Sequence, residues 1–205
     1  MKKGIIAKKI GMTQLLDENG IVSPVTVLQP CECSVLDVKN IDKDGYDSIL
    51  IGYGDIKESK VNKPKSGLFK KLNVKPKKHI KELRFENHDE IKGLKELTVD
   101  QFTEGEHIAC TSKSTGKGFQ GTIKVHGFAR GPMTHGSKNH RLPGSIGAGT
   151  DPARVFKGTK MGKKLGNKQR TIKGLKLVKI DKEKNIMFVK GSIPGKRKNL
   201  VLLHS

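Results

Sequence analysis

The sequence contains no tryptophan, two tyrosines and seven phenylalanines, so aromatic residues make up only 4% of its 205 residues. Hydrophobic residues make up 34%, which predicts a modest, mainly aliphatic core in one domain with an appendage or in two very small domains. No run of 18 apolar residues occurs, so no transmembrane helix is expected. The apolar stretch Gly4–Ala7 ends at Lys8 and is too short for the core of a signal peptide.

Cysteine is also scarce, with Cys31, Cys33 and Cys110 as the only three. An odd count favours a reducing compartment, so we expect a cytoplasmic protein, or an organellar one of the same chemistry. Cys31 and Cys33 lack a second pair, and the three histidines between residues 126 and 140 fit no zinc spacing. We therefore expect no metal and three cysteines that act as small core residues.

Acidic residues are almost missing from one part of the chain. The whole sequence has 41 Lys and Arg against 20 Asp and Glu, a net charge of +21. Residues 1–112 hold 19 basic and 17 acidic side chains, whereas residues 113–176 hold 15 basic side chains and the single acid Asp151. A smaller concentration of positive charge, Lys57–Lys81, contains ten lysines and one acid, Glu58. Charge so localised predicts a polyanionic partner, either nucleic acid or an anionic membrane.

The hydrophobic pattern is mainly β. Asp44-Gly45 predicts a hairpin turn between two strands, Val61–Lys81 predicts a basic loop, and Val99–Phe102 predicts one helical turn. We expect no long amphipathic helix. The stretches that predict strands are Ile21–Leu28, Ser34–Val38, Ser48–Tyr53, His107–Thr111, Leu175–Ile180, Ile186–Lys190 and Leu200–Leu203.

The simplest assembly is a small antiparallel β-barrel with strands from both ends of the chain, because closure removes exposed strand edges. We assign residues 1–55, 100–125 and 165–205 to this barrel, and residues 56–99 to a small basic α+β insertion. Residues 126–164 form a long basic loop. The stretch His126–Gly166 has 41 residues with nine glycines and three prolines. Its few large apolar side chains cannot offset the entropy of ordering it, so we expect it to fold into RNA.

The segment Gly116–Gly121 matches G-x-G-x-x-G, which opens the alternative of a nucleotide-dependent enzyme. The context does not fit, because Gly131-Pro132 follows too soon for a helix of useful length and no acid lies about 20 residues on. We expect no enzyme and no cofactor. The better interpretation is a backbone that approaches phosphates closely.

The expected RNA contacts are basic side chains that neutralise phosphates, histidines that donate to phosphates or stack on bases, and glycines. Phe119, Phe128 and Phe156 either stack on bases or anchor the loop in apolar pockets. The expected side-chain contacts are Lys117, Lys124, Arg130, His135, Lys138, His140, Arg141, Arg154, Lys157, Lys160, Lys163, Lys164, Lys168 and Arg170. The expected close backbone approaches are at Gly116, Gly118, Gly121, Gly144, Gly147 and Gly149.

Several segments together match a known pattern in order along the chain. They are Gly4–Thr13, Pro24–Val27, Gly116–Lys124, His135–Ser137, His140–Arg141, Pro143–Gly147, Val155–Gly162 and Val189–Gly195. In this combination the chain resembles the third universal family of large-subunit ribosomal proteins (the L-three family), in its bacterial type. It departs from the family at Ala109, where an acid is usual, and at Val125, where Arg is usual. Ala148 and Thr150 stand where some members carry a methylated Gln, so no such modification is expected.

The resemblance implies a translation-protein-type β-barrel and an extension, about Phe128–Lys164 with its tip near Ser145–Pro152, that reaches toward the peptidyl transferase centre. It implies binding to large-subunit (23S-type) rRNA, an early role in subunit assembly, and contacts with ribosomal proteins of the fourteenth and nineteenth families. We expect the protein in cytoplasmic ribosomes and not at a membrane. A general nucleic-acid architectural protein remains the alternative.

Overall fold

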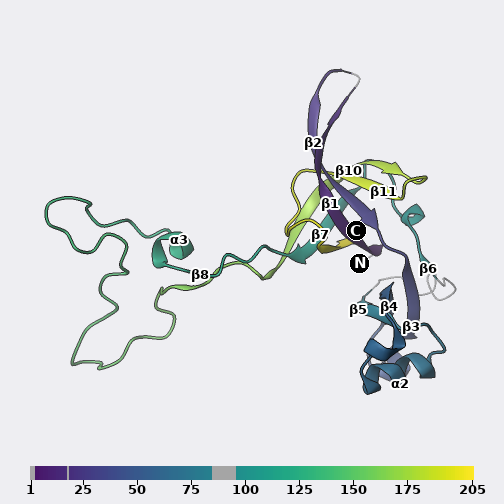
Figure 1. Ribbon diagram of the computed structural model, residues 1–205, viewed down its shortest axis with the longest axis horizontal. Helices are drawn as coiled ribbons and strands as arrows, with labels where there is room; N and C mark the ends of the chain where they lie inside the picture. Colours follow the sequence, from purple (N-terminus) through teal and green to yellow (C-terminus); the bar gives the residue numbers. More distant parts are fainter. Residues whose placement is uncertain (1–2, 18, 85–95) are drawn as a thin grey trace. The chain divides into compact units, whose positions relative to one another are not determined.

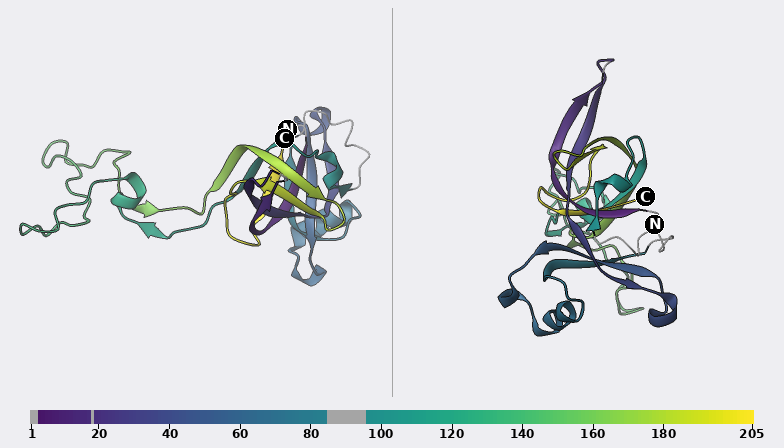
Figure 2. Two further views of the ribbon diagram at one scale, coloured as in Figure 1. Left: turned by 90° about the horizontal axis from the view of Figure 1, so that it is seen from above. Right: turned by 90° about the vertical axis from the view of Figure 1, so that its right-hand side faces the viewer.

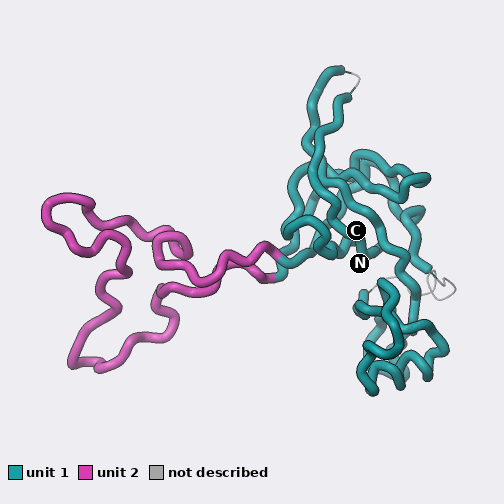
Figure 3. The backbone as a smooth tube through the Cα atoms, viewed as in Figure 1, with its two compact units in different colours: residues 1–113, 169–205 teal, residues 114–168 magenta. Residues whose placement is uncertain are grey.

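The computed structural model describes residues 3–17, 19–84 and 96–205. The chain divides into two compact units, residues 1–113 with 169–205 (the barrel unit) and residues 114–168 (the basic arm) (Figure 3). The strands and helices of the barrel unit are β1 Gly4–Leu16, β2 Val22–Pro30, β3 Cys33–Lys39, α1 Ile41–Asp44, β4 Ser48–Asp55, η1 Glu58–Lys60, α2 Lys63–Lys71, β5 Lys77–Leu83, β6 Glu96–Leu97, η2 Val99–Gln101, β7 His107–Lys113, β10 Gln169–Asp181, β11 Ile186–Lys190 and β12 Leu200–His204. Those of the arm are β8 Phe119–Gln120, α3 Thr122–His126 and β9 Lys163–Lys164.

A closed antiparallel barrel forms the centre of the barrel unit, with the strand order β1-β12-β7-β10-β11-β2 (Figure 1). The first and last strands are neighbours, because Gly4 pairs with His204 and Lys8 pairs with Leu200. The expected mainly β fold, with a barrel built from both ends of the chain, is confirmed. Each barrel strand has two partners, which leaves no free edge in the barrel itself.

Aliphatic side chains fill the barrel, as the composition predicts. Leu28, Ile108, Leu177 and Leu203 are at most 1% exposed. The three cysteines are free and buried, and Cys33 and Cys110 belong to the same hydrophobic cluster. The prediction that they are core residues is confirmed. Burial of such side chains, at about 1.5–3 kcal/mol each for the large aliphatics, is the main force that holds the barrel closed.

A second sheet, of order β5-β4-β3-β6, packs against the barrel through the same core. Residues 4–7 of β1 are therefore buried without alternation. We expected all of residues 1–55 in the barrel. Instead β2 ends at Pro30, and β3 and β4 form this sheet. The expected β3–β4 pairing is confirmed, but the two-residue turn is not: α1 connects the strands and ends at Gly45, which has a φ of 79°.

The expectation of a loop over Val61–Lys81 is wrong, because α2 and β5 lie within it. Pro64 stands in the first turn of α2, where the missing N–H costs nothing. Phe69 is 2% exposed and packs with Leu36 and Leu50, so tertiary burial stabilises a helix that contains Gly67. The helical turn expected at Val99–Phe102 is confirmed as η2. Residues 85–95 of the expected insertion lie outside the described part of the chain.

Candidate nucleic-acid interface

The basic arm begins as two chain segments that run side by side. Strand β8 pairs with β9. The Lys117 amide donates to the Leu165 carbonyl at 2.8 Å, and the Leu165 amide donates to the Gly118 carbonyl at 2.9 Å. These backbone bonds form a short stem and leave the side chains of Lys117, Lys163 and Lys164 exposed. The stem is the most regular part of the arm, which otherwise consists of turns, bends and one short helix.

Helix α3 follows the glycine motif and has only five residues. It ends at Gly127, which has a φ of 73°, a conformation that glycine adopts without a Cβ clash. The prediction that no helix of useful length follows the motif is confirmed. His126 bridges the arm, because its Nε2 lies 3.0 Å from the Met161 carbonyl oxygen.

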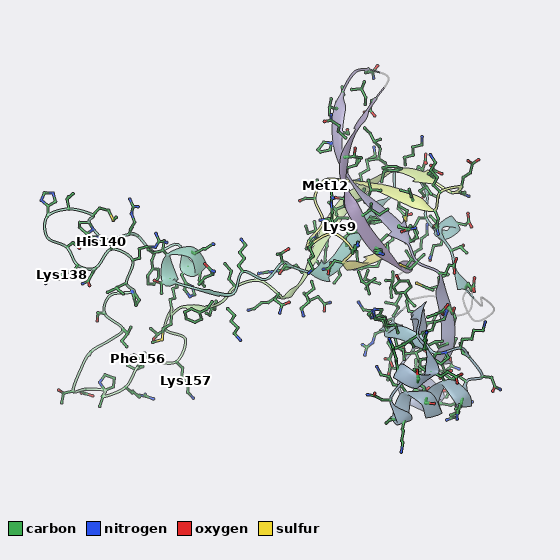
Figure 4. All side chains as sticks on the ribbon, viewed as in Figure 1. Lys9, Met12, Lys138, His140, Phe156 and Lys157 are labelled. Carbon is green, nitrogen blue, oxygen red and sulfur yellow. The ribbon has the colours of Figure 1, made fainter. Side chains whose placement is uncertain are left out.

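Two predicted histidine contacts differ in their surroundings. His140 is half-buried, and its Nδ1 lies 2.9 Å from the Pro132 carbonyl, while its own carbonyl accepts a bond from the Gly131 amide at 3.1 Å. This residue therefore closes a loop in the arm. His135 is exposed and has a φ of 58°. The exposed ring of His135 is available to a ligand, whereas one nitrogen of His140, which is labelled in Figure 4, already has the Pro132 carbonyl as its partner.

The predicted Lys and Arg contacts are all exposed. Arg170 lies in β10 of the barrel unit, and the other eleven lie in the arm, where Asp151 is the only acid. Over the described residues no ion pair involves any of these twelve cations. In the barrel unit, by contrast, Lys39 pairs with Glu82 at 2.6 Å and Lys77 with Asp55 at 2.8 Å. The arm therefore carries a positive potential that no side chain of its own neutralises.

The six predicted glycines mostly have open surroundings. A Cβ on Gly116 would lie 3.3 Å from the Asn167 Cβ, and a Cβ on any of the other five would meet no heavy atom within 4 Å. Gly118, Gly144 and Gly147 also have a positive φ, at 67°, 79° and 151°. Backbone atoms at these positions are thus accessible to a close ligand.

Sequence reasoning missed two glycines with stronger requirements. A Cβ on Gly131 would overlap the Asn139 carbonyl oxygen, and one on Gly166 would overlap the Thr115 carbonyl oxygen. Gly166 also has a φ of 75°. Neither contact is local in sequence, so no signal in the glycine pattern distinguishes these two positions from the other glycines of the arm.

The aromatic residues of the arm divide into two kinds. Phe119 is 71% exposed, with one ring edge against Gly162, and Phe156 is 57% exposed, with the Arg154 guanidinium 5.6 Å from its ring centroid. Phe128 is half-buried, with its ring centroid 6.0 Å from that of His126. Phe119 and Phe156 thus keep faces on which a base can stack. Within the described chain, both hydrophobic clusters lie in the barrel unit and none in the arm.

The smaller concentration of positive charge lies on α2 and its flanks in the barrel unit. Lys57, Lys63, Lys65 and Lys78 are among its exposed members. Burial lowers the pKa of Lys81, the one member that faces a pocket beside Leu202. This surface is a second cationic region, separate in sequence from the arm.

No group of three His, Cys, Asp or Glu side chains in the part of the chain that the structure describes is placed to hold a metal ion. No helix among the described residues is long and apolar enough to cross a membrane.

The comparisons with known proteins agree with the resemblance. Residues 34–186 match the model of the family described as ribosomal protein L3. The chain is 51% identical over 201 residues to the large ribosomal subunit protein uL3c of Phaeodactylum tricornutum, covering 98% of this chain and 97% of that relative. It is 51% identical to uL3 of Carboxydothermus hydrogenoformans and 49% identical to uL3 of a Geobacillus strain, over at least 99% of this chain and 97% of each relative. The chain therefore belongs to the ribosomal protein L3 family.

Proposed function

We propose that the protein is a non-catalytic constituent of the large ribosomal subunit in the cytoplasm, and that it binds large-subunit (23S-type) rRNA through the basic arm. The observation that carries this proposal is the charge of the arm. The arm has eleven exposed Lys and Arg side chains and a single carboxylate, that of Asp151. Within the described residues these eleven cations form no ion pairs. The names of the relatives, all large-subunit proteins, support the assignment.

Binding would proceed by phosphate neutralisation and release of counterions, with the arm taking its final shape in an RNA crevice. The arm lacks a hydrophobic cluster of its own among the described residues, so RNA supplies the surroundings that fix it. Exposed glycines such as Gly144 and Gly147 allow the backbone to approach phosphates. Such an insertion would make the surrounding rRNA more rigid.

Three finer points rest on the family resemblance. The tip of the arm, near Ser145–Pro152, would lie toward the peptidyl transferase centre. Binding would occur early in subunit assembly. The neighbouring proteins would belong to the fourteenth and nineteenth large-subunit families. Cations lie on both sides of the tip, from Lys117 to Arg141 and from Arg154 to Lys168, and they support insertion of the arm over a contact at the tip alone.

The test is sedimentation of a tagged copy expressed in cells. We expect the tagged chain to travel with large subunits through a high-salt wash, and the double variant Arg141→Ala/Arg154→Ala to be incorporated less. The control is Lys179→Ala/Lys190→Ala, which removes two exposed cations of the barrel unit. A wild-type chain that stays at the top of the gradient would overturn the proposal. Equal incorporation of the two variants would overturn the assignment to the arm.

A general nucleic-acid architectural protein is the second candidate, because the same charges attract any polyanion. Competition with duplex DNA distinguishes the two. We expect folded rRNA to displace labelled rRNA at a far lower concentration than duplex DNA does. Equal competition would favour the architectural protein.

A further inference from the structure

The longest stretch without a cation lies between Lys9 and Lys39. Its 29 residues contain no Lys or Arg and four acids, Asp17, Glu18, Glu32 and Asp37, in a chain of net charge +21. This part of the chain is thus poorly suited to contact phosphates through its own side chains.

Much of this stretch forms the β1–β2 hairpin, which extends beyond the barrel in Figure 1 and in the right panel of Figure 2. In the hairpin Gln14 pairs with Pro24 and Leu16 pairs with Val22. Directly opposed residues of an antiparallel pair point to the same face, as do alternate residues of one strand. Met12, Gln14, Leu16, Val22 and Pro24 therefore share one face, which we name the hairpin face.

Apart from Gln14 the hairpin face is apolar, and it is exposed. Met12, which is labelled in Figure 4, is 50% exposed, Leu16 is 71% exposed and Val22 is 51% exposed. The exposed part of this face begins at Met12, because Thr26, which pairs with Met12, is fully buried. On the opposite face Ser23 and Val25 are 7% and 0% exposed, whereas Thr13 is exposed. Single exposed apolar residues are ordinary on protein surfaces, but a contiguous set on one face of a projecting hairpin marks an interaction site.

We infer that the hairpin face is a docking surface for another protein, one that presents an apolar patch with cations at its edge. The apolar side chains would form the dry centre of the interface. The carboxylate of Asp17, exposed at the end of the hairpin, would meet the cationic edge. RNA fits this surface poorly, because residues 10–30 of the hairpin supply the carboxylate of Asp17 and no Lys or Arg of their own.

A second copy of this chain is a poorer occupant. Two chains of net charge +21 repel each other, and face-to-face hairpins would place apolar centres together without supplying cations opposite Asp17. The inference rests on the proposed function in one respect: the partner is sought among the proteins of the assembled large subunit.

The experiment is photo-cross-linking in assembled subunits. A tagged full-length chain carries a photoreactive amino acid at Met12, and large subunits are purified through a high-salt wash before irradiation. We expect an adduct with one basic protein at Met12. The same amino acid at Lys138, in the arm, should give an RNA adduct. At Thr13, which is exposed on the opposite side of β1, we expect loss of the protein adduct.

The outcomes separate the inference from the function on which it rests. An RNA adduct or a homodimer at Met12, in a chain that sediments with large subunits, overturns the docking surface and leaves the proposed function intact. A chain absent from large subunits overturns the proposed function and the docking surface with it. Binding of the isolated protein to rRNA is measured in parallel. This measurement tests the proposed function without cross-linking.

A variant without a photoreactive group gives a second readout. Met12→Ser/Leu16→Ser changes two exposed side chains, so the thermal midpoint of unfolding should stay close to that of the wild type. We expect the partner protein to be lost from variant subunits in the salt wash, while the variant chain itself is retained. Retention of every neighbouring protein in variant subunits would contradict the inference.

Discussion

The ammonium group of Lys9 lies 2.6 Å from the Ile193 carbonyl oxygen and 3.1 Å from the Gly195 carbonyl oxygen. Lys9 is only 8% exposed, so these two carbonyls take the place of water around a buried ammonium group. Burial lowers the pKa of this lysine. Its backbone is also tied to the same segment, since the Lys9 amide donates to the Asn199 carbonyl at 2.9 Å and the Lys198 amide donates to the Lys9 carbonyl at 2.7 Å. One residue of β1 thus fixes the connection between β11 and β12.

Replacement of this lysine should destabilise the barrel. Lys9→Met keeps the apolar stem but leaves the two carbonyls without their charged donor. We expect a loss of about 1–3 kcal/mol in the free energy of unfolding, measured by urea denaturation. The control is Lys8→Met at the neighbouring half-buried position, where no such bond is lost. Equal effects of the two changes would show that the bonds of Lys9 contribute nothing specific.

The cysteines should be inert in the folded protein. Burial raises the pKa of the Cys110 thiol to about 12 and that of Cys33 to about 11. A raised pKa means that less thiolate is present at a given pH, and the thiolate is the species that reacts. At pH 8 we expect iodoacetamide to label Cys110 and Cys33 only after denaturation. Rapid labelling of either residue in the native protein would contradict their placement in the core.

Gly166 should matter although it lies in the arm, outside the hydrophobic core. Alanine at Gly166 would be strained at a φ of 75°, and its Cβ would meet the Thr115 carbonyl. Since the left-handed conformation alone costs an L-residue roughly 1–2 kcal/mol, we expect Gly166→Ala to weaken rRNA binding by about tenfold. The control is Gly67→Ala, where a Cβ meets nothing within 4 Å. Unchanged affinity of Gly166→Ala would mean that the stem is not held in this form in the complex.

The parts of the fold that could be predicted are those with local signals. The stretches 107–111, 186–190 and 200–203 are strands because their apolar residues are bounded by turns, and the structure confirms each of them. Strand β1 was not singled out as a strand, because burial on both faces at residues 4–7 and a bulge between Lys9 and Gly11 remove the alternation. The helix at Lys63–Lys71 was missed because Pro64 and Gly67 suggested a loop, whereas the burial of Phe69 decides the outcome.

The candidate interface could be predicted for a related reason. Excess charge is a property of the local sequence, so a count of basic and acidic residues is enough to predict that the arm is cationic. The close contacts of Gly131 and Gly166 depend on residues across the arm, and the half-burial of His140 depends on Pro132. The hairpin face is not evident from the sequence, since its members come from two strands and form one surface only when β1 and β2 pair.

The salt dependence of RNA binding tests the arm most directly. Each phosphate contact contributes roughly 0.7–0.9 to the slope of log K against log salt concentration. The variant Lys157→Gln/Lys160→Gln/Lys163→Gln/Lys164→Gln removes four exposed cations and should lower that slope by about 3 if all four meet phosphates. A control with four exposed barrel-unit lysines, Lys43→Gln/Lys179→Gln/Lys190→Gln/Lys196→Gln, makes the same change in net charge. Because both variants alter the long-range field equally, a larger fall in slope for the arm variant isolates direct contacts. Equal falls would mean that the arm attracts RNA only through its net charge and does not enter it.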